Sequence, residues 1–571
     1  MEKWVVITKG GNYKEIGSRH QIDPVVARII RNRGVTTDAQ MEEFLAGTMD
    51  QIPSPHLLKD CDKAAALLKD GIKARKKLRV IGDYDIDGVT ASFILLRALT
   101  RLGADVDTCI PRRIEDGYGI HEHLIREARE DGVDILITCD NGIAAEKEVA
   151  LAKELGMTVI VTDHHEIPYR EISGKKEYFI PSADAVVNPK QPDCAYPFKN
   201  ICGAVVAFKL TAVLYELCGI PAEELEEFVE PAAIATVGDV MDLQGENRIL
   251  VKEGLKKLKH SQNKGIRSLI RCCGLEEAPK ITSYHIGFIL GPCINASGRL
   301  DTASRALALL DSRSDEEAFH LAEDLKVLND ERKYMTERGK QEAILQVEEG
   351  EAGKDRVLVL YLPDCHESLA GIIAGRIREL YNRPVFVLTD GQSAVKGSGR
   401  SIEAYSMYDE LVKCQDLLLQ FGGHPMAAGL SIEKEKIGEF RERLNRNCTL
   451  SPEDFVPKIQ IDLVLPFSFL SADLVRSLEI LEPYGKGNRK PLFACRDVRI
   501  RGLKIVGKNR NVVKMQALDE TGREVEAVYF GNAEEFYSFA HGREKMSITY
   551  FPEINTFRGM EEVQIVIQNY C

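Results

Sequence analysis

The sequence has no apolar run long enough to cross a membrane and no secretory pattern at its N-terminus. Residues 1–6 show no basic segment followed by an apolar core, and no later stretch approaches the roughly 20 apolar residues of a spanning helix. We therefore expect a cytoplasmic protein with no membrane partner.

The cysteines form no metal-binding or disulfide pattern. The 14 cysteines include no C-x-x-C pair, and two of them, Cys272 and Cys273, are adjacent. In a chain of 571 residues this spacing favours neither a zinc ribbon nor a disulfide framework. We expect most of the thiols to be reduced and buried, as free cysteine usually is.

The sequence also lacks an excess of positive charge. Lys and Arg number 75 and Asp and Glu number 88, which gives a net charge of -13. This balance argues against binding to polyanions through global charge, so any nucleic-acid contact must come from local basic surfaces or from metal ions. At this length, with 44% hydrophobic residues, the chain should divide into three or four domains of roughly 100 to 200 residues.

Short β-branched runs alternate with helical segments in the first half of the chain. Such alternation predicts a parallel sheet with helices on both faces, and ligands of such sheets gather at the carboxyl ends of the strands. The runs are Leu78–Gly82, Val133–Thr138, Met157–Thr162 and Ala185–Asn188, with helical segments such as Ala91–Leu102 and Ala145–Leu155 between them.

The rest of the chain changes texture twice. Residues 313–349 lack proline and are rich in Glu, Lys, Leu and Ala, which predicts one long connecting helix. A second α/β unit opens at Val357 and ends in two glycine-rich patches, at residues 397–401 and 422–425. After about Ser451, short alternating strands without long helices predict a small β-barrel.

Three acids follow the first predicted strand at alternate positions. Asp83, Asp85 and Asp87 should project into one crevice, and Gly88 allows a tight turn into the next helix. Carboxylates this close repel one another unless a cation lies between them, and hard oxygen ligands favour Mg²⁺ or Mn²⁺. The alternative is a calcium loop of the EF-hand type or a solvated acidic turn, but the distal glutamate of an EF-hand is missing.

Further acids and two histidines follow the other strands. Asp140 ends the second run, where a lone aspartate is more often a helix cap than a ligand. Asp163, His164 and His165 follow the third run and tilt a mixed site towards Mn²⁺. Asp239 lies in an apolar stretch, where a buried acid needs a partner. Six carboxylates and two imidazoles suit two metal ions, and such a pair best serves phosphoester hydrolysis.

These motifs, in this order, resemble the DHH phosphoesterase superfamily and, within it, its single-strand-specific exonucleases. The matching segments are residues 82–88, 139–142, 162–165, 238–239, 291–300 and 422–424. The resemblance implies that two ions, Mn²⁺ or Mg²⁺, are held by Asp85, Asp87, Asp140, His164 and Asp239, with Asp83 and Asp163 in or beside this set. His165 would hold the substrate or the ligand geometry.

The resemblance also implies a phosphate-binding wall on the second α/β unit. Asn295, Arg299, Ser398, Arg400 and His424 would grip phosphates there, and the arginine fork suits phosphate oxygens. Without the resemblance, residues 422–425 could form an ordinary turn and Arg400 could be a solvated strand residue.

The last predicted domain resembles an oligonucleotide-binding barrel. Between residues 496 and 514 seven basic side chains accompany one acid, a composition suited either to tracking a single strand or to a soluble β-surface. Tyr529 and Phe530 are candidates for base stacking. The expected division is an N-terminal segment (1–60), a DHH catalytic domain (61–312), a connecting helix (313–350), a DHH-associated α/β domain (351–450) and an OB-fold barrel (451–571).

The expected function is therefore a metal-dependent exonuclease on single-stranded DNA. The resemblance implies 5′ to 3′ polarity, a role in recombination and repair, and a monomer that meets a helicase and a single-stranded-DNA-binding protein. One alternative is a DHH phosphodiesterase for short oligonucleotides or cyclic dinucleotides, which would generally lack the barrel. Another is a non-catalytic replication scaffold, which would have lost ligands that this sequence retains.

Overall fold

The computed structural model describes residues 2–117, 119–172, 175–557 and 559–571. The described chain forms two compact units that do not follow sequence order. The first comprises residues 53–239 and 254–457, and the second comprises residues 2–52, 240–253 and 458–571. Within the described part of the chain, no helix combines the length and the apolar character that crossing a bilayer requires.

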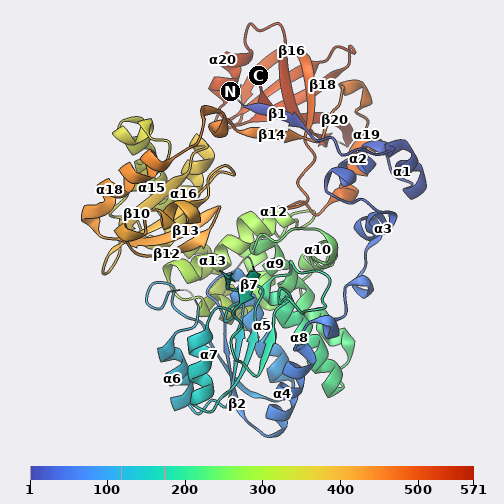
Figure 1. Cartoon of the computed structure of the whole chain (residues 1–571). Helices are drawn as coiled ribbons and strands as arrows, with labels where there is room; N and C mark the ends of the chain where they lie inside the picture. The colour runs from blue at the N-terminus through green and yellow to red at the C-terminus, as the bar shows by residue number, and fades with distance from the viewer. Residues whose placement is uncertain (1, 118, 173–174, 558) are drawn as a thin grey trace. The chain divides into compact units, whose positions relative to one another are not determined.

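The first unit contains the predicted parallel sheet (Figure 1). Five strands lie in the order β3-β2-β4-β5-β8, and every neighbouring pair is parallel. They are β3 (Asp105–Cys109), β2 (Lys77–Ile81), β4 (Ile135–Cys139), β5 (Thr158–Thr162) and β8 (Ala185–Val187). The prediction of a parallel α/β sheet is confirmed, and the edge strand β3 adds to the four predicted strands.

Helices cover both faces of this sheet. On one face, α6 (Glu122–Glu130) and α7 (Glu146–Glu154) share a core with strand residues such as Leu136 and Val159. The other face meets α4 (Cys61–Lys73), α5 (Ile86–Arg101) and α8 (Gly203–Cys218). Helix α5 is buried along most of its length and also packs against α9 (Val229–Gly238). This packing fixes the helices whose ends carry the predicted ligands.

A long helix leads to a second sheet in the same unit. Helix α15 (Asp315–Glu348) is continuous, as predicted, and it packs against α16 (Glu367–Tyr381). The second sheet has the order β12-β13-β11-β10-β9, and only β9 and β10 pair in parallel. Its strands are β9 (Leu358–Tyr361), β10 (Val385–Asp390), β11 (Val395–Arg400), β12 (Leu418–His424) and β13 (Ala427–Ile432).

The second unit is built around a closed, mostly antiparallel barrel, in which β18 and β20 pair in parallel. Strands β16 to β20 close because β16 also pairs with β19, and the order along the sheet is β15-β16-β17-β18-β20-β19. The strands are β15 (Leu463–Val464), β16 (Phe493–Val506), β17 (Val512–Leu518), β18 (Glu524–Phe530), β19 (Met546–Phe557) and β20 (Met560–Tyr570). The prediction of a C-terminal barrel is confirmed.

The N-terminal residues belong to the barrel unit. Strand β1 (Lys3–Val6) pairs in parallel with β14 (Lys458–Ile461), and α2 (Pro24–Asn32) contributes to the core around Phe493 and Tyr550 (Figure 1). A buried ion pair fastens the junction, because both guanidinium ends of Arg33 donate to the carboxylate of Asp462, at 2.6 and 3.0 Å.

Candidate metal centre

The predicted ligands converge at the carboxyl ends of the strands. Asp83 and Asp85 follow β2, Asp140 follows β4, His164 follows β5, and Asp239 ends α9. They form three overlapping groups of ligand atoms that lie within 4.8 Å of one another: Asp83, Asp85 and Asp140; Asp87, His164 and Asp239; and Asp140, His164 and His165. The shared members Asp140 and His164 place these groups side by side.

Backbone amides at two helix N-termini orient Asp85 and Asp87. Asp85 caps α5, where its Oδ1 accepts hydrogen bonds from the amides of Asp87 and Gly88 at 2.9 and 3.1 Å. The Asp87 carboxylate is buried and accepts from the amides of Gly203 and Ala204, at 2.6 and 2.7 Å. The first turn of α8 therefore holds this carboxylate in one orientation, through a contact that no sequence motif indicated.

Asp140 and His164 meet at the centre of the site. His164 Nε2 lies 3.1 Å from Asp140 Oδ1, 3.5 Å from Asp87 Oδ2 and 3.6 Å from Asp239 Oδ2. Asp140 is 2% exposed, and within the described chain its Oδ1, like Oδ1 of Asp83, has no hydrogen-bond partner. Buried oxygens without a donor are costly, so they call for a cation.

Asp163 has a different environment from the other acids. Its Oδ1 accepts from the amides of His164 and His165 and from His165 Nδ1, and its Oδ2 accepts from the amide of Ile143 at 2.9 Å. These bonds use both oxygens, and Asp163 lies outside the three ligand groups. The arrangement favours a role in orienting His165 over direct metal binding.

The electrostatics separate the acids into two classes. Burial and the neighbouring carboxylates raise the pKa of Asp83, Asp85 and Asp140, to well above the ordinary value for Asp83 and Asp140. Burial would raise the pKa of Asp163 too, but the hydrogen bond to His165 lowers it below the ordinary value. The first class gathers like charges that only a cation would compensate, as is typical of a metal-binding site.

The two histidines differ as well. Burial lowers the pKa of His164, so its imidazole is neutral at pH 7 and can act as a ligand. Burial would also lower the pKa of His165, but the bond to Asp163 and the nearby acids raise it to about 9. His165 is therefore cationic at neutral pH, and its side chain is 43% exposed.

These observations fit two divalent cations. Hard carboxylate oxygens dominate, one neutral imidazole adds a borderline ligand to one position, and the two oxygens of Asp140 can serve both positions.

Adding Mn²⁺ to the metal-free protein is expected to raise its unfolding temperature by roughly 5 °C at pH 8 and by less at pH 6. In the folded protein the pKa values of Asp83, Asp85 and Asp140 are raised above the ordinary carboxyl value. The metal-free folded state is therefore most stable when these acids are protonated, and its free energy of unfolding falls as the pH rises through the raised pKa values. A bound cation offsets this loss most where the acids are ionised. Thermal unfolding in EDTA and in Mn²⁺ measures the increment, and equal increments at both pH values would contradict the electrostatic argument.

The predicted phosphate-binding residues fall into two sets. Asn295, on α13 (Gly291–Leu300), accepts from the amide of Ile86 at 2.9 Å, so it supports the start of α5. Arg299, four residues on, donates to the carbonyl of Ser368 at 2.9 Å. Burial and the nearby Arg113 lower the pKa of Arg299 to about 10. A half-buried guanidinium among other cations is suited to an anionic ligand.

Ser398, Arg400 and His424 lie on the second sheet. Arg400 Nη1 donates to Ser398 Oγ at 3.2 Å, and both side chains lie against Gly371, where a Cβ would come within 2.7 Å of each. Arg400 is opposite Ala427, which is in turn opposite His424, so His424 is two strands away, about 10 Å across the sheet. His424 is exposed. Both glycine patches thus lie largely in strands rather than in turns.

Arg113 is a candidate site residue that the sequence motifs did not include. Its guanidinium lies 4.8 Å from the centre of the Tyr84 ring, and its charge contributes to lowering the pKa of both Arg299 and Arg400. Arg113 follows β3, the strand that the sequence pattern did not reveal, and its only signal was a basic pair at residues 112–113. Within the described residues none of the three arginines forms an ion pair with a carboxylate.

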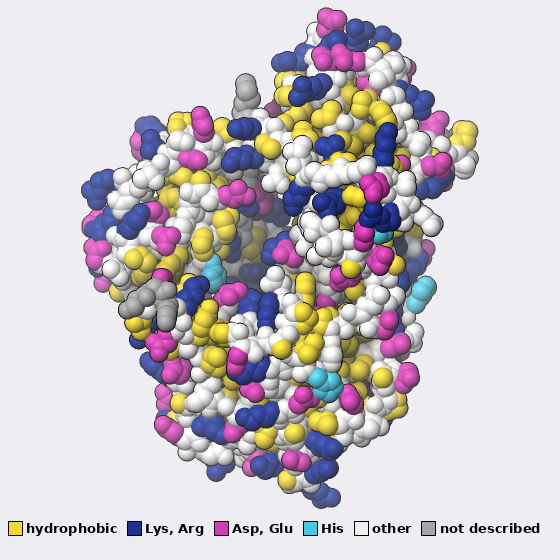
Figure 2. All heavy atoms as spheres, turned by 45° about the vertical axis from the view of Figure 1, so that its right-hand side comes forward, with side chains coloured by type: hydrophobic (Ala, Val, Ile, Leu, Met, Phe, Trp, Pro, Cys, Tyr) yellow, Lys and Arg dark blue, Asp and Glu magenta, His cyan; other side chains and the backbone are white. Residues whose placement is uncertain are grey.

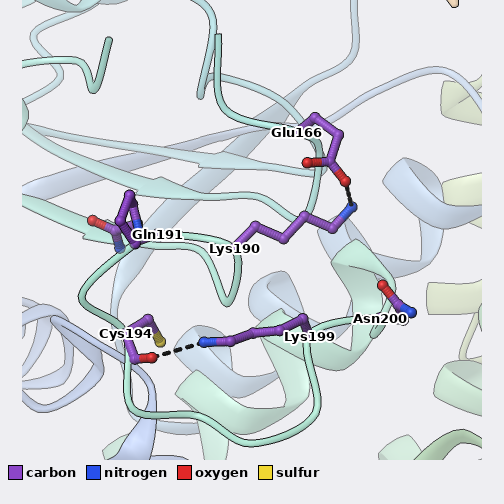
Figure 3. A pocket seen from close by; sticks show the side chains of 7 residues that line it. Glu166, Lys190, Gln191, Cys194, Lys199 and Asn200 are labelled. Atoms are coloured by element: carbon purple, nitrogen blue, oxygen red, sulfur yellow. Dashed lines mark hydrogen bonds and ion pairs between the residues drawn. The ribbon is translucent and has the colours of Figure 1, made fainter. Parts of the chain in front are cut away.

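A small cavity of about 390 Å³ is lined in part by Glu166, the residue that follows His164 and His165 (Figure 3). Lys190 forms an ion pair with Glu166 at 3.0 Å, and its charge contributes to lowering the pKa of His164. Across the cavity, Lys199 donates to the carbonyl of Cys194 at 2.7 Å. The lining therefore adds positive charge beside the metal centre.

A parallel sheet with acids and a histidine at its strand ends, followed by a long helix and a second α/β domain, defines the DHH class of phosphoesterases. Residues 77–236 match the model of the DHH family N-terminal domain, and residues 354–449 match the DHHA1 domain. Residues 461–569 match the RecJ OB domain, which narrows the class further.

Whole-chain similarity points to the same proteins. The single-stranded-DNA-specific exonuclease RecJ of Bacillus subtilis is 35% identical over 97% of this chain and 69% of its own length. The RecJ of Escherichia coli is 32% identical over 96% of both chains. A crystal structure of RecJ in complex with Mn²⁺ from Thermus thermophilus matches with a TM-score of 0.83 at 30% identity, over 100% of this chain and 79% of that one. The chain belongs to the RecJ family.

Proposed function

We propose that this protein is a metal-dependent exonuclease that hydrolyses single-stranded DNA from the 5′ end. The observation that carries the proposal is the set of buried, mutually repelling carboxylates around His164, beside three arginines without acidic partners among the described residues. This combination suits a phosphodiester held between cations. The family resemblance implies that this activity serves in DNA repair and recombination.

Five residues are proposed to hold two Mn²⁺ or Mg²⁺ ions: Asp85, Asp87, Asp140, His164 and Asp239. When bound, these ions lower the pKa of water and neutralise charge on the phosphate. Asp83 completes the acidic group with Asp85 and Asp140 and is proposed to lie beside the ligands. Asp163 is proposed to act through His165 and not through a metal, because its oxygens are already occupied by four hydrogen bonds.

His165 is proposed to contact the substrate. Its bond to Asp163 fixes the ring and, with the nearby acids, raises its pKa to about 9, which favours the protonated form. A fixed cation beside the ligands can bind a phosphate oxygen, and it can supply a proton to the oxygen that leaves phosphorus. In either role the imidazolium acts at the edge of the carboxylate cluster.

The arginines are proposed to receive the terminal phosphate of the strand. Arg299 and Arg400 are supplied by different segments, Arg113 is close enough to lower the pKa of both, and Asp85 is close enough to Arg299 to raise its pKa. Arginine forks recognise phosphate in two-point contacts, and their positive charge favours a terminal phosphate over a neutral hydroxyl. Ser398 holds one arginine in position.

The barrel is proposed to hold the rest of the strand. Its basic residues are exposed, although two of them, Arg510 and Lys514, pair with Glu534 and Glu526. On the face that Figure 2 shows, Lys and Arg are interspersed with Asp and Glu, so the binding would be local. Phe530 is 59% exposed and could stack with a base, whereas Tyr529 stacks on Phe536 in the core, with ring centres 4.5 Å apart. A barrel of this kind favours long strands over the dinucleotide alternative.

The helicase, the single-stranded-DNA-binding protein and the monomeric state remain proposals from the resemblance, as does a cytoplasmic location.

Strands labelled at either end test the proposal. With Mn²⁺, a 5′ label is expected to appear in the shortest product at the earliest times, while a 3′ label stays on a shortening ladder. Arg400→Lys is expected to slow hydrolysis of a 5′-phosphorylated strand about tenfold and to affect a 5′-hydroxyl strand less, because lysine loses the two-point contact. Arg376→Lys, on the exposed surface of α16, is the matched control.

Two outcomes would contradict parts of this proposal. Release of the 3′ label first would overturn the polarity and with it the role of the arginines. An equal effect of Arg400→Lys on both strand ends would place Arg400 at an internal phosphate. Parallel digestion of RNA and of duplex DNA establishes whether the activity is specific for single-stranded DNA.

A further inference from the structure

We propose that Cys273 and Cys293 form a modification site, a dithiol that peroxide converts reversibly into a disulfide. The two sulfurs are 3.7 Å apart and both cysteines are free thiols. A disulfide requires about 2.05 Å between the sulfurs, so each side chain must move by less than about 1 Å. The proposed hydrolysis of DNA does not use this pair.

The pair joins two helices of the first unit. Cys273 is the C-cap of α11 (Lys264–Cys272) and is half-buried, whereas Cys293 lies on α13 and is fully buried. One thiol therefore meets solvent and the other lies behind it. Cys272 directly precedes Cys273 in the sequence and is partly exposed. Its thiol is therefore a control for oxidation of a neighbouring cysteine outside the pair.

The surroundings of Cys293 make its thiol easier to deprotonate. Its sulfur contacts that of Cys273, where either thiol can be the donor, accepts from Asn329 Nδ2 at 3.3 Å, and donates to the carbonyl of Ile289 at 3.3 Å. The contact with Cys273, the bond from Asn329 and the nearby Lys333 and Lys326 lower the pKa of Cys293 against the effect of burial. Asn329 is itself buried on α15 and accepts from the guanidinium of Arg332 at 2.9 Å. A thiolate beside a thiol is the arrangement from which disulfides form.

The reaction balances with hydrogen peroxide as the oxidant. The Cys273 sulfur attacks one peroxide oxygen while its proton passes to the Cys293 thiolate, the O–O bond breaks, and hydroxide leaves. The resulting sulfenic acid on Cys273 is attacked by Cys293, the S–O bond breaks, and water leaves with the second proton. Two sulfurs lose two electrons, and peroxide is reduced to water and hydroxide.

The disulfide would act on the site through α13. Cys293 lies two residues before Asn295, whose Oδ1 accepts from the amide of Ile86 at the start of α5, and six before Arg299. Drawing Cys293 towards α11 shifts these contacts. This second step rests on the proposed function, whereas formation of the disulfide does not.

Peptide mapping tests the modification itself. Full-length protein is treated with hydrogen peroxide, its remaining thiols are alkylated, and the tryptic peptides are analysed by mass spectrometry. The expected product links residues 272–280 to residues 281–299, has lost two hydrogen atoms, and disappears after reduction. Trypsin leaves Cys272 and Cys273 on one peptide, so Cys272→Ser must retain the link and Cys273→Ser must abolish it. Cys273→Ala repeats the second arm in case serine perturbs the fold.

Activity gives the second readout. Oxidised wild-type protein and oxidised Cys272→Ser are expected to hydrolyse single-stranded DNA roughly tenfold more slowly, with recovery after reduction, because small displacements at such a site are costly. Cys273→Ser is expected to be insensitive to peroxide. Absence of the link in the wild type, or a link through Cys272, overturns the site. A link without loss of activity overturns only the coupling through α13. If wild-type protein that has not been treated with peroxide fails to hydrolyse single-stranded DNA, the proposed function is wrong, and the disulfide is judged by peptide mapping alone.

Discussion

Asp140→Asn is expected to reduce Mn²⁺-dependent hydrolysis of single-stranded DNA by about a thousandfold or more. Asp140 is shared by two ligand groups, and its Oδ1 lies 3.1 Å from His164 Nε2. Asparagine keeps the shape but removes the charge that is proposed to bind both cations, and a metal site with one weakened shared ligand loses both affinity and geometry. Asparagine also tolerates the left-handed backbone of residue 140, whose φ is 60°.

The same variant is expected to be more stable than the wild type when no metal is present. The pKa of Asp140 is raised well above the ordinary value by burial and by Asp87, Asp85 and Asp83, so its ionised form costs stability at neutral pH. The neutral amide of asparagine removes that cost. Unfolding in EDTA at pH 8 should therefore occur at a higher temperature, and added Mn²⁺ should raise it less than in the wild type.

Asp105→Asn is the matched control for this experiment. Asp105 is an exposed acid at the amino end of β3, on the same sheet but at the opposite end from the ligands. Its replacement should leave both hydrolysis and the Mn²⁺ increment unchanged. If Asp140→Asn hydrolyses DNA at the wild-type rate in Mn²⁺, Asp140 does not hold a catalytic ion.

The sequence predicted the first sheet well because its buried strands have a simple pattern. Strands β2, β4 and β5 are short β-branched runs that are followed by acids, and parallel strands place those ends at one edge. Asp239 was also recoverable, since an acid in an apolar stretch is costly without a partner. Strand β3 was not predicted because its sequence, DVDTC, lies at an edge of the sheet and contains two acids instead of a continuous β-branched run.

Long-range contacts explain the rest of what the sequence did not reveal. The pairing of β1 with β14 joins Lys3 to Lys458, and no local pattern encodes a partner at that separation. The glycine patches were uninformative for another reason, because glycine is rare in strands except where another group approaches closely, as happens at Gly397 and Gly399. Arg113 follows β3, so it could not be identified as a site residue without that strand.

A glycine outside every ligand motif is expected to have the second-largest effect. Gly203→Ala should reduce hydrolysis by about a hundredfold or more, although residue 203 carries no chemical group of its own. A Cβ at Gly203 would lie 2.7 Å from Cβ, 2.8 Å from Oδ1 and 3.0 Å from Cα of Asp140. These contacts are too short, and two of the three atoms belong to the rigid part of the residue, so the loop or α8 must shift.

Such a shift would disturb two of the proposed ligands at once. The Gly203 amide donates to Asp87 Oδ2 at 2.6 Å, so moving the first turn of α8 releases Asp87 while the new methyl group displaces Asp140. Because catalysis depends on ligand positions to within about 1 Å, the loss should fall mainly on kcat, with Mn²⁺ affinity also reduced. Steady-state kinetics across a Mn²⁺ titration separates these two effects.

Gly375→Ala provides the matched control, since it makes the same change inside a helix with open space around it. Residue 375 lies in α16, and a Cβ there would meet no atom within 4 Å among the described residues. This variant should retain full activity and gain slightly in stability, because alanine is favoured over glycine in a helix by about 1 kcal/mol. Equal activities of Gly203→Ala and Gly375→Ala would show that α8 does not position the ligands, and the amide bonds to Asp87 would then serve only to satisfy a buried charge.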